Sequence, residues 1–438
     1  MLYERWRKIA AEWHGQPALR DTASGRRWTF AELFAAGESW QGAPALAAPK
    51  LPSEGWSGPA SVSGIIFPQG HSPEFILGLL AAWRENKIIC PLEPGQTLPQ
   101  VPIPPVDCVH LKCTSATTGA ARVIAFTAEQ LAADAENIVA TMGLRPDWPN
   151  LGAISMAHSY GFSNLVLPLL LHGVPLIIAP SPLPEAVRHA AKGEPALTLA
   201  GVPALWRAWH EANAIPPNVR LAISAGAPLP LALEQAVFQM RGVKIHNFLG
   251  SSECGGIAYD SAETPRTDDA CVGAPMRNVE LTLNADGCLQ VHGRAVGETY
   301  WPDAADTLGS GRFQTSDLAE LKDGFVFLRG RAGDLINVAG RKVSPETIER
   351  ALAAHPQIRE CLVFGAPSRD VERTEIIVAV VAGNATDSEL KHFLQPRLPA
   401  WQVPREWWFV ASLSANLRGK VSRVEWKRKF LELRANIN

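Results

Sequence analysis

The chain has 438 residues, more than one hydrophobic core usually serves, so we expect at least two domains. Its formal net charge of -2 at pH 7 argues against nucleic acid as the main partner. The seven cysteines include no Cys-x-x-Cys pair, which predicts reduced thiols in a cytoplasmic protein. The charged start of the chain lacks the apolar core of a signal peptide, and the apolar run 165–180 is too interrupted for a membrane span.

Strand and helix patterns alternate along the first half of the chain. The segment 28–33 is typical of a short helix entry. Short apolar runs predict strands at 65–67, 88–90, 175–179 and 219–224. Helical periodicity predicts helices at 73–85, 127–142 and 231–240. This alternation favours layered α/β packing.

A run of hydroxyl side chains around a glycine follows the apolar segment that ends at Cys113. The run is Thr114-Ser115-Ala116-Thr117-Thr118-Gly119-Ala120-Ala121-Arg122. Each hydroxyl can donate to a phosphoryl oxygen, Gly119 permits close approach of the backbone, and Arg122 adds charge-assisted hydrogen bonds. The Gly-Lys-Ser/Thr ending of a Walker loop is missing, so both a phosphate loop and a polar turn stay open.

The pattern changes in the last third of the chain. The segments 284–287 and 322–324 are typical of tight turns between short strands. Beyond Gly330, helix starts are predicted at Ser344-Pro345 and at the capping box of Thr386 with Glu389. Strands are predicted at 361–365, 375–382 and 406–410. We therefore predict a first domain at 1–329 and a compact α+β second domain at 330–438.

Further polar motifs follow the hydroxyl-rich run in a distinctive order. They are His158-Ser159-Tyr160-Gly161-Phe162, Ser224-Ala225-Gly226-Ala227-Pro228, Gly250-Ser251-Ser252-Glu253, Thr315-Ser316-Asp317, Gly330-Arg331 through Gly340-Arg341-Lys342, and Gly419-Lys420-Val421-Ser422-Arg423. This series resembles the motifs of the adenylate-forming superfamily, the AMP-dependent synthetases and ligases, which includes acyl-CoA synthetases, adenylation domains and luciferases. The resemblance covers nearly the whole chain. It implies a large α/β N-terminal domain of two layers plus a distorted β-barrel, and a small mobile α+β C-terminal domain.

The resemblance also implies a reaction. A carboxylic acid attacks the α-phosphorus of ATP to give acyl-AMP and pyrophosphate, and a thiol of coenzyme A or of a carrier protein's phosphopantetheine then takes the acyl group. Both first reactants are anions, so the catalyst needs hydroxyl and amide donors, a divalent cation and a basic side chain. The implied catalytic residues are Lys420, Glu253 and His158. Glu253 is also the implied Mg²⁺ ligand, and Lys420 would reach the carboxylate and the α-phosphate.

The remaining implied roles concern nucleotide, acid and hinge. Nucleotide binding would fall to the phosphate-loop residues Thr114, Ser115, Thr117, Thr118, Gly119 and Arg122, with Gly226, Ala227, Pro228, Leu249, Gly250, Ser252, Asp317 and Arg331. The acid pocket would contain His158, Tyr160, Gly161, Ser224, Ala225 and Phe248, and Gly333 would be the hinge. Ala116, Ala121, Arg122 and Leu249 depart from the family's glycine, proline, lysine and aromatic residue.

The substrate class and two alternatives complete the prediction. The chain has no acidic residue between Leu151 and Leu183, where amino-acid-activating relatives place an aspartate, so we predict an aryl or short to medium acyl acid without an α-ammonium group. A nucleotide-binding scaffold with impaired catalysis is one alternative, which the phosphate-loop departures motivate. An adenylating enzyme with a non-thiol acceptor is the other.

Overall fold

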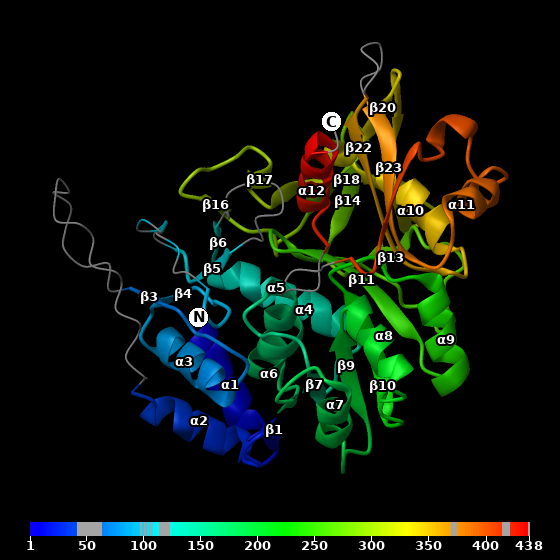
Figure 1. Cartoon of the computed structure of the whole chain (residues 1–438). Helices are drawn as coiled ribbons and strands as arrows, with labels where there is room; N and C mark the ends of the chain where they lie inside the picture. The colour runs from blue at the N-terminus through cyan, green and yellow to red at the C-terminus, as the bar shows by residue number, and fades with distance from the viewer. Residues whose placement is uncertain are drawn as a thin grey trace. The chain divides into compact units, whose positions relative to one another are not determined.

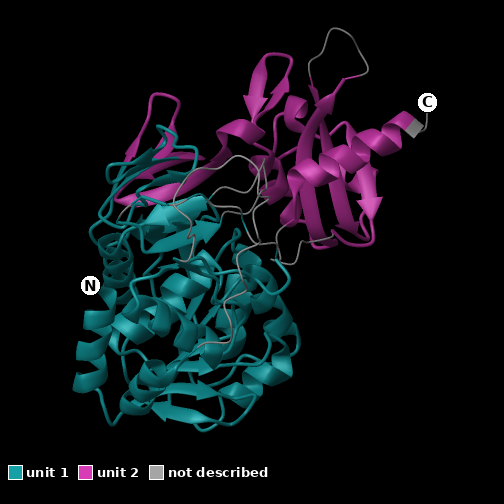
Figure 2. Ribbon diagram, turned by 90° about the vertical axis from the view of Figure 1, so that its left-hand side faces the viewer, with its two compact units in different colours: residues 1–116, 120–281, 290–314 teal, residues 117–119, 282–289, 315–438 magenta. Residues whose placement is uncertain are grey.

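The computed structural model describes residues 1–41, 64–96, 99, 102, 104–105, 107–113, 123–368, 375–413 and 421–436. The described residues form two compact units (Figure 2). The first comprises residues 1–116, 120–281 and 290–314, and the second comprises residues 282–289 and 315–438. The units therefore divide near residue 315, whereas the sequence pattern placed a change at Gly330.

A large mixed sheet organises the first unit (Figure 1). Its strands run in the order β13-β12-β11-β10-β9-β7-β8-β1-β2. Their bounds are β1 Pro17–Asp21, β2 Arg27–Thr29, β7 Asn150–Gly152, β8 Leu176–Ile178, β9 Leu197–Gly201, β10 Val219–Ala225, β11 Ile245–Ser251, β12 Gly255–Tyr259 and β13 Cys271–Pro275. The strands from β1 to β11 along this order pair in parallel. Their carboxyl ends consequently lie along one edge of the sheet.

A second sheet in the same unit has the order β16-β6-β5-β4-β3. Its strands are β3 Ile65–Ile66, β4 Ile88–Ile89, β5 His110–Cys113, β6 Val123–Phe126 and β16 Thr299–Trp301. Strands β3, β4 and β5 pair in parallel, and β6 lies antiparallel between β5 and β16. The predicted strands at 65–67, 88–90, 175–179 and 219–224 are thereby confirmed, each within two residues.

Two helices of this unit, α2 and α4, begin at capping boxes. The helices of the unit are α1 Leu2–Glu12, α2 Phe30–Ser39, α3 Pro73–Arg84, α4 Ala128–Met142, α5 Ser159–Gly161, α6 Leu167–His172, α7 Pro184–Ala190, α8 Pro203–Glu211 and α9 Leu231–Arg241, with a π-helix at Phe162–Val166. Thr127 forms a capping box with Gln130 at the start of α4. The helix entry predicted at 28–33 is wrong in its first residues, because Thr29 caps α2 and Trp28 belongs to β2.

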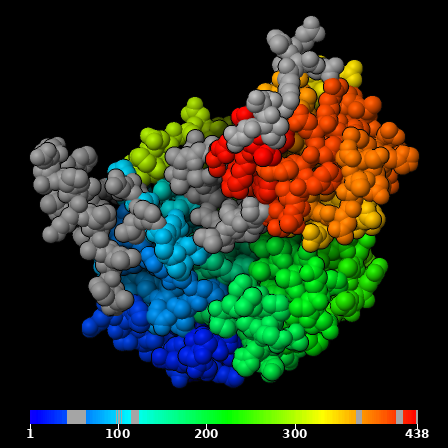
Figure 3. All heavy atoms as spheres, in the orientation of Figure 1, coloured from blue at the N-terminus to red at the C-terminus, as the bar shows by residue number. Residues whose placement is uncertain are grey.

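The packing of the first unit brings distant parts of the chain together. Strand β1 pairs with β8, so the blue N-terminal residues lie beside the green central residues on its surface (Figure 3). Trp206 and Trp209 of α8 are fully buried, and they pack with aliphatic side chains from β7, β9 and β10. Burial of this apolar area provides most of the driving force for holding the parallel strands in register.

The second unit contains a small three-stranded sheet. The described elements of the unit as a whole, in chain order, are β18 Arg312–Lys322, β19 Phe325–Arg331, the 3₁₀ turn Ala332–Asp334, β20 Ile336–Val338, β21 Arg341–Val343, α10 Pro345–Ala353, β22 Ile358–Pro367, β23 Glu375–Gly383, α11 Asp387–Leu394, the 3₁₀ turn Ala400–Gln402, β24 Glu406–Val410 and α12 Arg423–Asn436. Strands β14 Glu280–Leu283, β15 Cys288–His292 and β17 Leu308–Gly309 precede them in the chain. The sheet has the order β22-β23-β24.

Strand β23 is buried on both faces, and its side chains alternate between two cores. Ile377, Ala379 and Val381 pack with residues of α10 and α11. Val378 and Val380, on the opposite face, pack with Trp426 and Phe430 of α12. A strand with helices on both faces reads as a continuous apolar run, which is how the sequence predicted it. The predicted strands at 361–365, 375–382 and 406–410 are confirmed.

Candidate active site

Several predicted site segments of the first unit lie where its parallel strands end. Strand β10 runs directly into Gly226, Ala227 and Pro228, which are exposed, and Ala225 pairs with Phe248 of β11. Strand β7 leads into the segment that contains Ser155 and His158. In open α/β sheets, ligands bind outside the carboxyl ends of the strands. This edge is therefore the candidate active site.

Tyr160 forms an aromatic wall at this edge. Its hydroxyl donates to the carbonyl oxygens of Ile223 at 3.3 Å and Gly201 at 3.5 Å, and its ring centroid lies 5.9 Å from that of Phe248. Burial raises the pKa of the Tyr160 hydroxyl, which stays neutral. A Cβ on Gly161 would lie 2.0 Å from the Ser155 carbonyl oxygen, so only glycine permits this close approach.

His158 is held by a partner that sequence reasoning missed. Its Nε2 lies 3.0 Å from Oε1 of Glu93, and Ser155 Oγ donates to the same oxygen at 2.5 Å. The side chains of His158 and Glu93 are 34% and 30% exposed, so solvent reaches both. Glu93 follows β4, and no spacing pattern links it to His158. Glu93 follows a strand of one sheet and His158 follows a strand of the other, so only the tertiary structure brings the two residues together.

Glu253 lies in the turn between β11 and β12. Its backbone N–H donates to Ser251 Oγ at 3.2 Å, and its carbonyl oxygen accepts from Gly297 N–H at 2.8 Å. The Tyr300 hydroxyl donates to Glu253 Oε1 at 3.2 Å. Mg²⁺ is commonly held by one or two carboxylates plus substrate phosphates, and a partly exposed, oriented carboxylate suits that role. Sequence reasoning missed Tyr300, which belongs to the distant strand β16.

Asp134 of α4 holds the turn that carries Glu253. Its carboxylate accepts from Gly256 N–H at 3.2 Å and from Ser163 Oγ at 2.6 Å. Gly255 has a φ of +68°, and a Cβ there would lie 2.0 Å from Asp134 Oδ1. The neighbouring Cys254 is buried, and burial raises the pKa of its thiol, as is typical of a packing cysteine rather than a nucleophile.

Strand β5, which precedes the hydroxyl-rich run, contains two buried basic side chains. Lys112 Nζ lies 4.3 Å from the centroid of the Phe126 ring and has no hydrogen-bond partner among the described residues. Burial lowers the pKa of Lys112 and also that of His110. The predicted phosphate-loop residues Thr114, Ser115, Thr117, Thr118, Gly119 and Arg122 lie outside the described residues.

The other predicted residues of the first unit differ in their accessibility. Ser224 and Ala225 are buried within β10, and Ser224 Oγ has no hydrogen-bond partner in the described part of the chain. Gly250 is exposed, whereas Leu249 and Ser252 are half-buried. A ligand can therefore reach Leu249, Gly250 and Ser252. The side chains of Ser224 and Ala225 are buried in β10.

The second unit contains the remaining described candidates. Asp317 and Arg331 are opposite each other in β18 and β19, and Arg331 Nε donates to Asp317 Oδ1 at 3.0 Å. Gly333 lies in the 3₁₀ turn that follows. Lys420 lies outside the described residues.

Arg423, three residues beyond Lys420 in the sequence, is an anchor within the second unit. Its guanidinium donates to Asp334 Oδ2 at 2.5 Å, to Glu349 Oε1 at 2.9 Å and to the Val363 carbonyl at 2.8 Å. The neighbouring carboxylates outweigh burial and raise the pKa of Arg423, which stays charged. Arg423 belongs to the last of the polar motifs, which by itself indicated no role for this residue.

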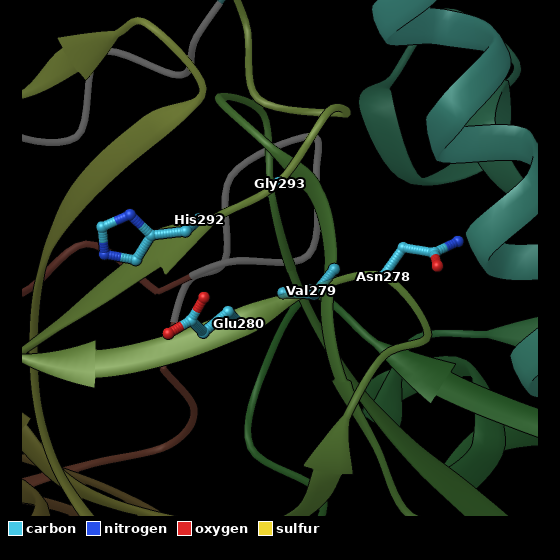
Figure 4. Close-up of a pocket in the computed structure, with 5 residues that line it drawn as sticks. All are labelled: Asn278, Val279, Glu280, His292 and Gly293. Carbon is cyan, nitrogen blue, oxygen red and sulfur yellow. The ribbon is translucent and has the colours of Figure 1, made fainter.

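An open hollow of about 410 Å³ in the first unit is lined by Asn278, Val279, Glu280, His292 and Gly293. The side chains of Glu280 and His292 point to one side, whereas that of Asn278 points away from them (Figure 4). None of these residues belongs to the predicted site, so the arrangement at the sheet edge, rather than this hollow, defines the candidate active site.

Three further observations concern metal sites, membrane spans and disulfides. The described residues contain no group of three or more histidine, cysteine or acidic side chains suited to hold a metal ion by themselves. Among the same residues, every helix is too short or too polar to cross a bilayer. The seven cysteines, all of them described, form no disulfide.

This chain is similar to known proteins in both its sequence and its fold. Residues 81–301 match the family model of the AMP-binding enzyme, and residues 347–420 match that of the AMP-binding enzyme C-terminal domain. The chain is 28% identical over 339 residues to 2-succinylbenzoate–CoA ligase of Bacillus cytotoxicus, covering 73% of this chain and 69% of the relative. It is 27% identical over 356 residues to feruloyl-CoA synthase of Amycolatopsis, covering 76% and 72%.

Two solved structures illustrate the shared fold. ATP-bound MatB from Rhodopseudomonas palustris has a TM-score of 0.83 at 18% identity, covering 99% of this chain and 100% of that one. MenE from Bacillus subtilis, in complex with its acyl-adenylate, has a TM-score of 0.78 at 20% identity, covering 97% of each chain. The two structures confirm the predicted fold class. The family models and the ligase relatives confirm the predicted enzyme class, an AMP-forming acyl or aryl-acid ligase. The chain belongs to the AMP-binding enzyme family.

Proposed function

We propose that this enzyme activates an aryl or short to medium acyl carboxylic acid with ATP and transfers the acyl group to coenzyme A. The observation that carries the proposal is the sheet edge, where an aromatic wall, a histidine, a glycine loop and an oriented glutamate follow the strand ends. Two relatives, a 2-succinylbenzoate–CoA ligase and a feruloyl-CoA synthase, support an aromatic acid and coenzyme A. The phosphopantetheine thiol of an acyl carrier protein is the alternative acceptor.

In the first half-reaction a carboxylate oxygen bonds to the α-phosphorus of ATP, and the bond to pyrophosphate breaks. Glu253, oriented by Tyr300, would hold Mg²⁺, which neutralises phosphate charge when bound. Ser252 would donate to the α-phosphate, and Gly226 to Pro228 would flank the adenine. His158 and Tyr160 would lie at the acid.

The other nucleotide contacts would come from the phosphate loop and the second unit. Thr114, Ser115, Thr117, Thr118, Gly119 and Arg122 would bind the β- and γ-phosphates. Asp317 would accept hydrogen bonds from the ribose hydroxyls, and Arg331, already paired with it, would support the ribose or phosphate. Leu249 would give the adenine an aliphatic contact in place of an aromatic one, with Gly250 beside it.

We further propose that residues 330–438 rotate about Gly333 as a mobile domain that delivers Lys420. Gly333 is exposed, and a Cβ built there would meet nothing within 4 Å. Arg423 links the chain just beyond Lys420 to Asp334, the neighbour of the hinge glycine. This ion pair supports a rigid connection between the lysine-bearing segment and the hinge inside one unit.

The pocket chemistry supports an acid that lacks an α-ammonium group. Glu93 is a carboxylate outside the sequence window from Leu151 to Leu183, yet it lies beside His158. Its Oε1 is already engaged by His158 and Ser155, so this carboxylate oxygen is committed to the protein. A cytoplasmic location is in keeping with the seven cysteines, all described, which form no disulfide.

Acid-dependent exchange between ATP and pyrophosphate, without any thiol, tests the first half-reaction with a panel of aryl, short acyl, medium acyl and amino acids. We expect exchange with one class of aryl or acyl acid. Lys420→Ala should lower exchange by about 100-fold or more while sparing thiol attack on supplied acyl-AMP. Lys429→Ala, which removes a partly exposed cation paired with Glu425, is the matched control and should retain activity.

The alternatives predict other outcomes. ATP binding with no exchange for any acid would favour the scaffold with impaired catalysis. Exchange without thioester formation, and with an amide or ester among the products, would favour a non-thiol acceptor. Full exchange by Lys420→Ala would refute the role assigned to that lysine.

A further inference from the structure

We propose that Glu93 is a positioning residue that fixes the ring of His158 for acid activation, and this assignment rests on the proposed function of the same site. Glu93 Oε1 lies 3.0 Å from His158 Nε2 and accepts from Ser155 Oγ at 2.5 Å. Two donors from the segment that follows β7 therefore converge on one oxygen from the segment that follows β4.

The chemistry of the pair determines which ring nitrogen carries hydrogen. An ionised carboxylate can only accept hydrogen bonds, so His158 Nε2 must be the donor. In the neutral ring Nδ1 is then the acceptor, and the ring plane is fixed by the same bond. A histidine ring oriented in this way by a carboxylate keeps a constant position at the pocket, which is what a group that contacts the reacting acid needs.

Glu93 and Ser155 are themselves held by backbone contacts. The Glu93 N–H donates to Gln96 Oε1 at 3.2 Å, and Gln96 N–H returns a bond to the Glu93 carbonyl at 3.0 Å. Leu92, just before Glu93, is buried. Ser155 Oγ accepts from Ala157 N–H at 3.2 Å. The carboxylate is thus preorganised before any substrate binds.

The exposure of the pair places it at the site rather than in the core. About a third of each side chain is exposed, so a bound acid can contact His158 without first breaking its bond to Glu93. Partial exposure also leaves the charge of Glu93 in contact with water. Its contacts with His158 and Ser155 therefore do not have to offset the full desolvation cost of a buried charge.

Glu93→Gln tests the proposal, because the amide keeps one oxygen acceptor in a side chain of the same shape, removes the charge and replaces the other oxygen with an NH2 donor. In the exchange assay we expect turnover to fall about 10-fold with the KM for ATP unchanged, since a charge-assisted hydrogen bond becomes a neutral one. Glu85→Gln is the matched control, because Glu85 pairs with Lys87 on the surface, and it should behave as wild type.

A double-mutant cycle separates positioning from a general structural effect. If Glu93 acts through His158, Glu93→Gln should have no further effect on turnover in a His158→Ala background. Nitrogen-15 spectra of the histidine rings give an independent reading. The resonances that disappear in His158→Ala are assigned to His158. They should show the Nε2-protonated tautomer in the wild type and a mixture of the Nε2- and Nδ1-protonated tautomers in Glu93→Ala.

The outcomes distinguish this assignment from the proposed function. Wild-type exchange with undiminished turnover in Glu93→Gln would overturn the role of Glu93 and leave the function standing. An undiminished 10-fold effect in the His158→Ala background would also overturn it. Absence of exchange in the wild type would overturn the proposed function and, with it, this assignment.

Discussion

Two polar clusters in the first unit are each built around a glutamate but differ in their exposure to solvent. In the closed network, Glu234 accepts from Lys244 Nζ and from Arg266 Nε at 2.9 Å, and Lys244 also donates to Asp260 at 2.6 Å. Each of these residues is at most 6% exposed. In the open cluster, Glu93, Ser155 and His158 make equally short contacts while solvent still reaches the carboxylate and the ring.

The difference shows how burial separates a sealed ionic network from a cluster that solvent can reach. The closed network contains two cations and two anions, and nothing but protein can reach them, so it joins α9, β11 and the loop after β12. A buried pair of this kind tolerates no lost partner, because the remaining charge is left desolvated. The open cluster can exchange a protein contact for a substrate contact at little desolvation cost.

The largest effect is expected from Glu234→Gln in the closed network. The change leaves Lys244 and Arg266 with one fewer negative charge in a buried setting, so the free energy of unfolding should fall by about 3–5 kcal/mol. Denaturant unfolding measures this loss. Glu85→Gln, in a surface pair, should change stability by less than about 0.5 kcal/mol. Equal losses in the two variants would remove the distinction between the clusters.

Lys112→Met should have an intermediate effect of opposite sign. Lys112 is buried without a hydrogen-bond partner among the described residues, so an apolar side chain of similar length should raise the free energy of unfolding by about 1–3 kcal/mol. Burial lowers the pKa of Lys112 from 10.5, so the unfolded chain holds this proton more tightly. The wild type therefore gains stability as pH rises from the lowered pKa of the folded chain toward 10.5, and the advantage of the variant shrinks over this range.

Unfolding curves at several pH values measure this trend. A destabilised Lys112→Met, or an advantage that grows with pH, would show that Lys112 is favourably paired in the folded chain.

The smallest effect is expected from Ser155→Ala in the open cluster. The substitution removes one donor to Glu93 but leaves His158 in place, so turnover in the exchange assay should fall by about 2- to 5-fold. The thermal unfolding midpoint should stay within a degree or two of wild type, because the site is partly solvated. A large loss of stability would place the open cluster with the closed one.

Local signals in the sequence predicted the elements well. Thr127 and Thr386 start their helices with the capping boxes that their sequences encode, and the apolar run 375–382 became the doubly covered strand β23. Trp28 was misassigned because the cap at Thr29 starts the helix at Phe30, two residues later than the apolar pattern indicates. The order of the polar motifs predicted the family, and the carboxyl ends of parallel strands explain where several of those motifs lie.

The partners of the site residues were not predictable. Tyr300 orients Glu253, Asp134 pins the turn that carries it, and Glu93 holds His158. Each partner lies on a different element from the residue that it contacts, so no local spacing in the sequence predicts the contact. The predicted roles of Lys420 and the phosphate loop stay predictions, since both lie outside the described residues.

By itself the sequence predicted many of the helices and strands, because caps and periodicity act over a few residues. Its succession of polar motifs predicted the class of enzyme through the resemblance to a family. Only the tertiary structure decided which carboxylate lies beside His158 and which acids are sealed in the closed network. Those outcomes depend on burial and on the parallel pairing of strands far apart in the chain, which set the desolvation of each charge and the direction of each side chain.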